Sequence, residues 1–411
     1  MRILQINTVY KNGGSTGRIV YDLSQVMRQE DIESFIAFGY EYSKTADQNT
    51  YKIEDIPTLK CNILKTRVFG KHGFYNNGVT KRFLNWIDTV KPDIIHLHNL
   101  HNDYVNIELL FDYIKMHDIP VIWTLHDCWS FTGWCANFDF SGCDKWKTGC
   151  EHCPSLKEYP FTWFFDRSKE IYSGKKKIFN GVNNLTIITP SQWLADLVKQ
   201  SFLKDYKVKV INNGIDLSVF KVTESNFREK HNLQNKTIVL AMAMKLSKQK
   251  GIEYLLQLPD LLPDDYCLVL VGIDENQRKL LPKNNCVGIT KTNNAVELAE
   301  IYSAADMFVN PTLGDNFPTT NLEALACGTP VITFRTGGSP ESVDDNVGIV
   351  VAKGNLDELV NAIIKVREKN KLSYSPYCIA KASQSYNKEK QALKYIDVYK
   401  ENVKAKETAD L

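Results

Sequence analysis

The sequence predicts an α/β protein with two doubly wound domains, each built on a parallel sheet. Two observations support this prediction. Short β-branched runs alternate with stretches of helical periodicity along most of the chain, as in successive βαβ units. The runs also fall into two series, which an Asn213-Gly214 turn signal separates. A chain of 411 residues is long enough for two or three domains of about 150 residues each.

Nine strands are expected from the apolar runs. In the first domain, residues 1–213, they cover residues 2–7, 34–38, 93–98, 121–125 and 185–189. In the second domain, residues 214–385, they cover residues 237–242, 266–271, 306–310 and 331–334. A tail from residue 373 to residue 402 has Tyr and Ile at helical spacing. Open α/β sheets bind ligands at the carboxyl ends of their strands, so functional side chains are expected there.

Charge and hydropathy exclude several classes of protein. The chain carries 50 Lys and Arg against 48 Asp and Glu, a net charge of +2, without the basic excess of a nucleic-acid-binding protein. With 43% hydrophobic residues and no long block of charge, it is not a disordered chain. No apolar run reaches the roughly 18 residues of a membrane span, and the first ten residues indicate a buried strand rather than a signal peptide. We therefore expect a cytoplasmic protein.

Two carboxylates, Asp315 and Glu323, follow the predicted strand 306–310. Asp315 is expected in the loop at the carboxyl edge of the sheet, and Glu323 one turn into a helix that ends at Gly328. A helix N-terminus attracts a diphosphate, which predicts a phosphate-binding segment. That segment comprises Asn316, Phe317, Pro318, Thr319 and Thr320. The pair Thr320 and Glu323 also fits a capping box, and the two roles can coexist.

Two cations, Lys245 and Lys250, directly follow the first strand of the second domain. Two cations across a turn would stabilise negative charge, such as that of a phosphate leaving group. The alternative is a solvated loop, since Lys248 lies in the same stretch and runs of charge are usually exposed. Of the two lysines, Lys250 is the stronger candidate.

A glycine-rich loop with Gly13, Gly14 and Gly17 follows the first strand and opens a helix. Glycines there let the backbone approach a ligand closely, although a simple tight turn would look the same. Asn12 occupies the place of the first glycine of a dinucleotide fingerprint, and the next strand does not end in an acidic residue. A nicotinamide cofactor is therefore disfavoured.

His126 and Asp127 lie at the carboxyl end of the strand 121–125. A histidine there can hydrogen-bond a hydroxyl group or buffer charge near neutral pH. Its competitors are His96, His98 and His101, any of which can be structural, and His98 and Asn99 remain candidates for the acceptor side.

The segment from residue 128 to residue 165 is rich in cysteine and aromatic residues. Cys135, Cys143, Cys150 and Cys153 have spacings that suit a structural zinc ion, with disulfides or plain buried thiols as alternatives. The scattered cysteines Cys61, Cys267, Cys286, Cys327 and Cys378 are expected to be small buried side chains. The segment holds eleven aromatic residues and precedes three consecutive lysines, 175–177. The rings are expected either to pack in a core or to contact an acceptor sugar or an anionic membrane surface.

The motifs VNPTLGDNFPTTNLEALACGTPVITFRTGGSPE, INNGID and NGGSTG together resemble the family-4 retaining glycosyltransferases of the GT-B fold. The segments TLHDCWSFTGWC and DKWKTGCEHCP are similar to a branch that synthesises colanic-acid-like exopolysaccharide and O-antigen. The resemblance implies two Rossmann-like domains facing across a cleft, the first on the acceptor side and the second on the donor side. It also implies that a C-terminal helix, 386–411, packs back onto the first domain.

The resemblance further implies roles for individual residues. Asp315, where the family has Glu, would contact donor-sugar hydroxyls, and Glu323 would contact the ribose. His126 would lie beside the reacting sugar, while Gly13 and Gly14 line the site near the phosphates.

The activity implied is transfer of a sugar, with retention, from a UDP- or GDP-sugar to a glycan or polyprenyl-linked glycan acceptor. No catalytic metal is required if Lys245, Lys250 and helix-end amides hold the diphosphate. The protein would work in the cytoplasm, with peripheral contact to the inner face of the membrane. The alternatives are an inactive sugar-nucleotide-binding protein of the same fold and a GT-B epimerase or phosphorylase.

Overall fold

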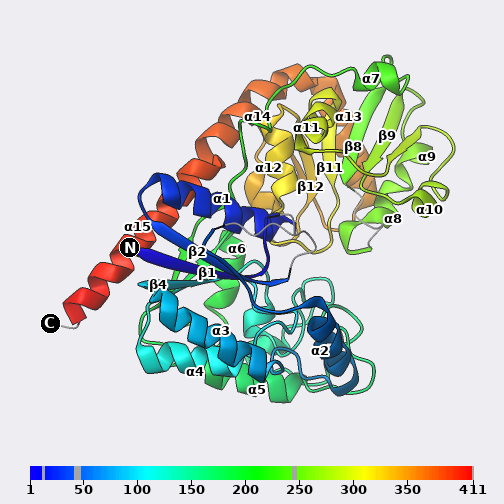
Figure 1. Cartoon of the computed structure of the whole chain (residues 1–411). Helices are drawn as coiled ribbons and strands as arrows, with labels where there is room; N and C mark the ends of the chain where they lie inside the picture. The colour runs from blue at the N-terminus through cyan, green and yellow to red at the C-terminus, as the bar shows by residue number, and fades with distance from the viewer. Residues whose placement is uncertain (12–13, 41–47, 243–247, 410–411) are drawn as a thin grey trace. The chain divides into compact units, whose positions relative to one another are not determined.

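The structure is a computed structural model that describes residues 1–11, 14–40, 48–242 and 248–409 (Figure 1). The chain divides into two compact units. Unit 1 comprises Met1–Asn212 and Glu389–Leu411, and unit 2 comprises Asn213–Lys388. The expected boundaries were at residues 213 and 386, within a few residues of the observed ones.

Unit 1 is built on a seven-stranded parallel sheet of order β3-β2-β1-β4-β5-β6-β7. Its strands are β1 (Arg2–Val9), β2 (Glu33–Tyr40), β3 (Thr50–Lys52), β4 (Ile94–Leu97), β5 (Val121–Thr124), β6 (Leu185–Thr189) and β7 (Lys207–Val210). Its helices are α1 (Ser15–Gln29), α2 (Ile56–Phe69), α3 (Asn77–Val90), α4 (Ile107–His117), α5 (Ser168–Phe179), α6 (Gln192–Val198) and α15 (Lys388–Ala409).

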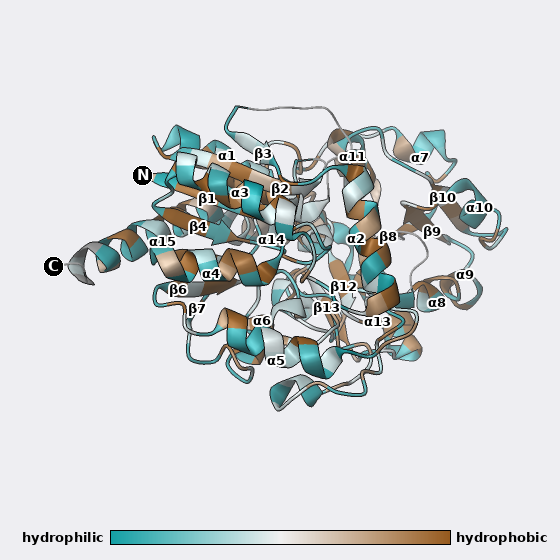
Figure 2. Cartoon of the chain, turned by 60° about the horizontal axis from the view of Figure 1, so that its bottom comes forward, coloured by the Kyte–Doolittle hydropathy of each residue, from teal (hydrophilic) through white to brown (hydrophobic). Residues whose placement is uncertain are grey.

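The alternation of side chains along the central strands produces two cores, one on each face of the sheet of unit 1. Ile3, Ile94, Ile122 and Ile188 face α1 and α15. Their neighbours Leu4, Ile95, Trp123 and Ile187 belong to the opposite core, which includes residues of α3, α4 and α5. In Figure 2 the surface helices of this unit alternate brown and teal, as expected of helices that bury one face.

Unit 2 is built on a six-stranded parallel sheet of order β10-β9-β8-β11-β12-β13. Its strands are β8 (Thr237–Met242), β9 (Tyr266–Val271), β10 (Cys286–Ile289), β11 (Met307–Asn310), β12 (Val331–Phe334) and β13 (Gly348–Val351). Its helices are α7 (Phe227–Lys230), α8 (Ile252–Leu255), α9 (Leu258–Leu261), α10 (Glu275–Arg278), α11 (Ala295–Ala304), α12 (Thr319–Ala326), α13 (Leu356–Lys369) and α14 (Lys371–Ser385). Two 3-10 turns, η4 (Lys248–Lys250) and η5 (Ser339–Ser342), flank the site described below.

All nine predicted strands are present, and the tail from residue 373 to residue 402 is helical, as predicted. The tail forms two helices, α14 and α15, with a break at Tyr386 and Asn387. There the backbone of Ile215 donates a hydrogen bond to the Tyr386 carbonyl (2.8 Å) and accepts one from the Lys388 amide (3.1 Å). The chain therefore pairs with an extended segment at the point where a continuous helix would bond to itself.

The insertion from residue 128 to residue 165 contains two 3-10 turns, η1 (Trp129–Phe131) and η2 (Lys145–Lys147). Some of its rings are buried in the core of unit 1, namely Trp129, Phe131, Trp134, Phe138 and Trp146. Others are exposed, namely Phe140, Tyr159, Trp163, Phe164 and Phe165. Core packing therefore explains part of the aromatic content and leaves a second, exposed set.

Two further observations concern cysteine burial and the membrane. Cys61 was expected to be buried and is exposed, because it lies on the outer face of α2. Among the described residues, no helix combines the length and the apolar character needed to cross a bilayer.

Candidate active site

The helix α12 presents its N-terminus at the carboxyl edge of the sheet of unit 2, after β11 and a loop of residues 311–318. It begins at Thr319 with Pro318 as the N-cap residue, and within the described residues no side chain caps it. The predicted capping box between Thr320 and Glu323 is therefore not formed, because the helix begins before Thr320. The first N–H groups of a helix have no partner inside it, so this end can bind an anion.

The C-terminus of α12 ends as the sequence predicts. Gly328 has a φ of +70°, and the Thr329 amide donates to the Ala324 carbonyl at 2.9 Å. This is the hydrogen bond of a Schellman motif, which needs a residue in the left-handed region. A β-carbon at Gly328 would also lie 2.3 Å from the Ser375 hydroxyl, so both geometry and space require glycine.

Glu323 lies one turn into α12 with only 8% of its surface exposed. The Tyr302 hydroxyl, from α11, donates a hydrogen bond of 3.2 Å to Oε2 of Glu323. Burial raises the pKa of Tyr302 well above its usual range, as does the Glu323 charge, so the phenol keeps its proton and remains a donor. Tyr302 therefore holds the carboxylate of Glu323 in a fixed orientation.

Lys250 and Asp315 form an ion pair of 2.5 Å between Nζ and Oδ2. Asp315 lies in the loop that precedes α12, and Lys250 ends the turn η4. Lys248, the first residue of the same turn, instead forms an ion pair with Glu253 at 3.1 Å. The ion pair thus places one cation and one carboxylate together near the start of α12, while the other predicted cation, Lys245, lies outside the described residues.

Gln249 fixes η4 against the loop that carries Asp315. Its carbonyl accepts from the Leu313 amide at 2.7 Å, and its side-chain amide donates to the Gly314 carbonyl at 2.9 Å. Gly251 follows with a φ of +73°, and a β-carbon there would lie 2.0 Å from the Pro311 carbonyl oxygen. The close approach of these two backbones positions the ion pair.

A buried polar network lies under the start of α12 and centres on Asn321. Its Oδ1 accepts from Asn310 at 2.8 Å, and its Nδ2 donates to the hydroxyls of Ser339 (3.1 Å) and Ser342 (3.0 Å). The Thr333 hydroxyl, on β12, continues the network to the Asn310 carbonyl at 3.0 Å. The network ties the ends of β11 and β12 to α12 and η5.

Unit 1 holds His126 in a row of side chains at the carboxyl end of β5. Its Nε2 lies 3.1 Å from Nδ1 of His98, whose Nε2 lies 3.3 Å from Oε1 of Gln5. Burial lowers the pKa of His126 to about 4, and His101 adds to this effect against the opposing charge of Asp127. His126 is therefore neutral near pH 7, which favours hydrogen bonding over charge buffering.

The remaining histidine candidates separate into different environments. His101 pairs with Asp127 at 3.0 Å and with the Tyr159 hydroxyl at 2.7 Å. His96 is fully buried, between the Tyr399 hydroxyl of α15 (2.7 Å) and the Thr124 hydroxyl (2.8 Å). His96 is therefore structural and His101 is also buried, whereas His126 and Asp127 are partly exposed.

The glycine-rich loop begins α1. Gly14 is the N-cap residue with a φ of +98°, and a β-carbon at Gly17 would lie 3.1 Å from the Tyr10 backbone. Glycine at position 14 therefore permits the positive φ, and glycine at position 17 permits the close approach to the Tyr10 backbone. Gly13 lies outside the described residues.

Asn99, the other acceptor-side candidate, lies in the loop after β4. Its carbonyl accepts hydrogen bonds from the Thr8 and Tyr104 hydroxyls, which fix this loop.

Sequence reasoning did not single out Tyr302, Gln249 and Asn321. Tyr302 and Gln249 are far in sequence from the residues they hold, and their patterns resemble an ordinary helix and an ordinary turn. Of the three, only Asn321 could have been inferred from the sequence, because an asparagine on the apolar side of a helix needs buried hydrogen-bond partners.

Comparison with known proteins identifies the family. The model for glycosyltransferase family 4 matches residues 13–219, about half of the chain, and the model for group 1 glycosyl transferases matches residues 223–383. The chain belongs to glycosyltransferase family 4. The resemblance noted in the sequence is thereby confirmed.

Two bacterial relatives illustrate the similarity. The chain is 30% identical over 376 residues to an Escherichia coli K12 protein named as a colanic acid biosynthesis glycosyl transferase, WcaC, covering 88% of this chain and 89% of WcaC. It is 26% identical over 221 residues to the E. coli enzyme UDP-Gal:alpha-D-GlcNAc-diphosphoundecaprenol alpha-1,3-galactosyltransferase. That match covers 49% of this chain and 56% of the enzyme.

Solved structures of glycosyltransferases share the fold. Sucrose-phosphate synthase from Thermosynechococcus elongatus superposes with a TM-score of 0.73 at 16% identity, covering 98% of this chain and all (100%) of that one. HepE from Anabaena, in complex with UDP, gives a TM-score of 0.69 at 16% identity and the same coverage. The predicted GT-B fold is confirmed.

Proposed function

We propose that this glycosyltransferase moves a sugar, with retention of configuration, from a nucleotide-sugar donor to a glycan or lipid-linked glycan in cell-surface polysaccharide synthesis. The observation that carries the proposal is the ion pair of Lys250 with Asp315 beside the uncapped start of α12. A cation, a carboxylate and free helix-end amides are the groups that a sugar diphosphate requires. The names of WcaC and the galactosyltransferase favour a surface-polysaccharide acceptor.

Unit 2 would hold the donor through three kinds of contact. Lys250 and the N–H groups of Thr319 and Thr320 would bind the diphosphate, whose charge grows as the sugar leaves. Asp315 would accept hydrogen bonds from sugar hydroxyls, and Glu323, held by Tyr302, would accept those of the ribose. HepE structures with UDP and UDP-glucose support a UDP-sugar as the first donor to test.

The reaction would need no catalytic metal, because Lys250 and the helix end supply positive potential. The bond between the anomeric carbon and the phosphate oxygen breaks, and the acceptor hydroxyl forms the new bond on the same face of the sugar. The leaving phosphate oxygen takes the hydroxyl proton, so no separate base is required. His126, neutral at pH 7, would hydrogen-bond a sugar hydroxyl.

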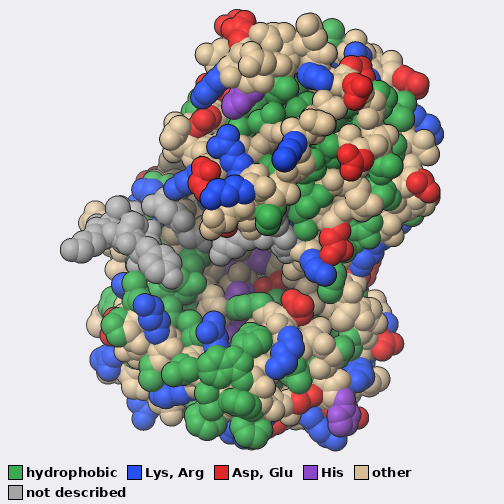
Figure 3. All heavy atoms as spheres, turned by 90° about the vertical axis from the view of Figure 1, so that its right-hand side faces the viewer, with side chains coloured by type: hydrophobic (Ala, Val, Ile, Leu, Met, Phe, Trp, Pro, Cys, Tyr) green, Lys and Arg blue, Asp and Glu red, His purple; other side chains and the backbone are tan. Residues whose placement is uncertain are grey.

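A lipid-linked acceptor would require contact with a membrane surface, and unit 1 has a candidate patch. On the face shown in Figure 3, hydrophobic side chains gather in the lower part of the view. Exposed Leu64 and Phe69 of α2 lie beside the loop with exposed Phe164 and Phe165, since the Trp163 amide donates to the Arg67 carbonyl at 2.8 Å. Exposed cations of the same region are Lys60, Lys65, Arg67 and Lys157, whereas Lys169 pairs with Glu151 at 3.0 Å. Such a mixture of rings and cations favours an anionic membrane surface.

Vesicle flotation tests this membrane contact. The protein is expected to float with vesicles that contain phosphatidylglycerol, less so at high salt, and the double variant F164S/F165S should lose most of this binding. Met116→Ser removes an equally exposed apolar side chain from α4 and should have no effect. Absence of salt-sensitive binding to anionic vesicles would contradict the membrane contact but not the transfer reaction.

Donor binding tests the proposed site. Thermal shift with UDP-, GDP- and ADP-sugars should show stabilisation by one nucleotide class, since a ligand that binds the folded state raises its stability. Glu323→Gln should weaken that shift. If none of the nucleotide sugars shifts the wild type, the donor site is wrong.

A further inference from the structure

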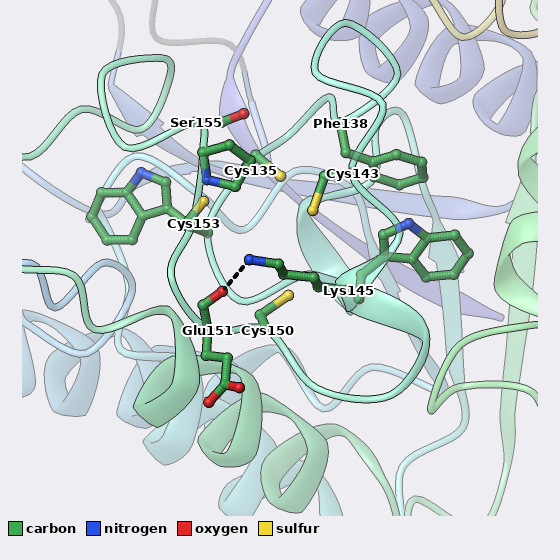
Figure 4. A pocket seen from close by; sticks show the side chains of 11 residues that line it. Cys135, Phe138, Cys143, Lys145, Cys150, Glu151, Cys153 and Ser155 are labelled. Atoms are coloured by element: carbon green, nitrogen blue, oxygen red, sulfur yellow. Dashed lines mark hydrogen bonds between the residues drawn. The ribbon is translucent and has the colours of Figure 1, made fainter.

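Four cysteines of the insertion line one small cavity. Cys135, Cys143, Cys150 and Cys153 surround about 10 Å³ of space, room for a single atom or water. Figure 4 shows their sulfur atoms directed to this space. All four are free thiols. The four side chains come from loops on either side of η2, so the cavity is where these loops meet.

A backbone donor points to sulfur in this cluster. The Gly133 amide donates to Sγ of Cys150 at 3.2 Å. A β-carbon at Gly133 would lie 2.6 Å from Cβ of Cys150, so the close approach requires glycine. Backbone N–H groups that donate to sulfur stabilise thiolates, which are the form that binds metals.

One buried cation, Lys175, lies beside the cluster. Lys175 of α5 is fully buried, and its Nζ donates to the carbonyls of Trp129 (2.6 Å) and Thr132 (3.2 Å). Within the part of the chain that the structure describes, Lys175 makes no hydrogen bond to a carboxylate. Its Nζ also lies 3.4 Å from the centre of the Trp129 ring, and burial lowers the pKa of Lys175 well below its usual range, an effect that Asp127 partly opposes. A buried ammonium is costly unless a negative charge compensates it.

We propose that Cys135, Cys143, Cys150 and Cys153 bind one structural zinc ion. Zinc with four thiolates carries two negative charges, which would add to the negative charge of Asp127 near Lys175. The four thiols would release four protons on binding. Among the described residues, no group of three His, Cys, Asp or Glu side chains is already arranged to hold a metal ion. Binding would therefore draw the sulfur atoms inward around the cavity.

A zinc ion explains why this insertion holds a shape. From residue 132 to residue 165 its regular structure is the single turn η2, so hydrogen bonds of helices and strands do not order it. The tetrahedral ion would join the segments before and after η2, in the way that small metal-bound domains are stabilised. The zinc site belongs to unit 1 and the donor site to unit 2, and the zinc proposal does not depend on the proposed transfer reaction.

Metal analysis of the full-length protein, purified without added zinc, tests the proposal. The expected content is about one zinc per chain, and Cys150→Ser and Cys153→Ser should each lose it. Cys286→Ser, which changes a half-buried thiol of β10, is the matched control and should keep it. Less than about half an equivalent in the wild type, after incubation with zinc and a reductant, would overturn the proposal.

Two further measurements keep the test decisive if the serine variants do not fold. Wild-type protein freed of metal and given cobalt should show the sulfur-to-cobalt charge-transfer bands of a tetrahedral thiolate site. Lys175→Met should lower zinc affinity by roughly 10-fold to 100-fold, as loss of a supporting group does, whereas Lys177→Met at an exposed position should not. A mass that shows a disulfide among these cysteines would overturn the proposal.

Discussion

Lys250 and Asp315 are 65 residues apart in the chain and form an ion pair of 2.5 Å. Neither group is fully exposed, since 38% of the lysine side chain and 19% of the aspartate side chain are accessible. Gln249 bonds both segments, so the pair is part of a fixed arrangement. Lys250 is therefore already in position to bind a donor diphosphate. Once Lys250 binds the diphosphate, Asp315 could hydrogen-bond to sugar hydroxyls instead.

Lys250→Ala is expected to reduce turnover by about 100-fold to 1000-fold, because it removes a positive charge from the developing diphosphate. Lys248→Ala is the matched control, since Lys248 belongs to the same turn but is 76% exposed and pairs with Glu253. Steady-state rates at saturating donor measure both variants. Equal rates for Lys250→Ala and Lys248→Ala, with unchanged melting, would show that Lys250 is not in the site.

Glu323→Gln is expected to weaken donor binding, because a neutral amide of the same shape accepts weaker hydrogen bonds from the ribose. Tyr302→Phe should have a smaller effect of the same sign, since it removes only the hydrogen bond that orients Glu323. Calorimetric titration with the preferred nucleotide measures both. A larger loss for Tyr302→Phe than for Glu323→Gln would contradict a direct ribose contact.

Asn321→Ala is expected to destabilise unit 2 by about 2–3 kcal/mol, because it leaves buried hydroxyl and amide groups without partners. Urea unfolding at constant pH gives the free energy of unfolding. Thr320→Ala changes an adjacent, partly exposed residue of the same helix and should cost far less. Similar losses for the two variants would show that the buried network does not stabilise α12.

His126 should stay neutral throughout the pH range in which the enzyme is assayed. Its pKa of about 4 places protonation well below the ordinary value of 6.5, because burial disfavours the cation. The rate profile between pH 5 and pH 8 should therefore contain no inflection near 6.5 that disappears in His126→Gln. An inflection near 6.5 that vanishes in the variant would show that His126 titrates as an exposed imidazole.

His96 should make the stability of unit 1 depend on pH. Burial lowers its pKa to about 3, from 6.5 for an unperturbed group, so folding favours the neutral form. The contribution of neutral His96 to the free energy of unfolding is fully present above pH 6.5 and is lost as the pH falls toward 3. The linkage amounts to about 1.4 kcal/mol per pH unit for one proton. The difference in unfolding free energy between wild type and His96→Gln should therefore shrink from pH 7 to pH 5, and a constant difference would contradict this.

Strand prediction from sequence succeeded in the centre of each sheet and failed at the edges. The four strands that were not predicted, β3, β7, β10 and β13, are the outermost strands of the two sheets. Central strands such as β9 are fully buried and read as continuous apolar runs, whereas β7 is partly or fully exposed along its length. Edge strands lack the apolar run on which such predictions depend.

Prediction of the site depended on which residues lie in one motif. Asp315, Glu323 and Gly328 fall within a single stretch, so the sequence indicated both the loop and the helix end. Lys250 was predicted by the need for a cation, but its pairing with Asp315 depends on the tertiary contact between η4 and the loop 311–315. Tyr302 could not be inferred, because only the packing of α11 against α12 brings it to Glu323.

The central claim is transfer of a sugar from a nucleotide donor, and a coupled measurement of donor consumption and product tests it most directly. The protein is incubated with the nucleotide sugar that stabilises it, with and without lipid-linked glycan acceptors, and released nucleoside diphosphate and glycan are quantified. Sugar transfer with retention predicts that one nucleoside diphosphate is released per sugar transferred and that release occurs only when acceptor is present. The product should keep the anomeric configuration of the donor. Diphosphate release with free sugar, an epimerised donor, an inverted product, or binding without turnover would contradict it.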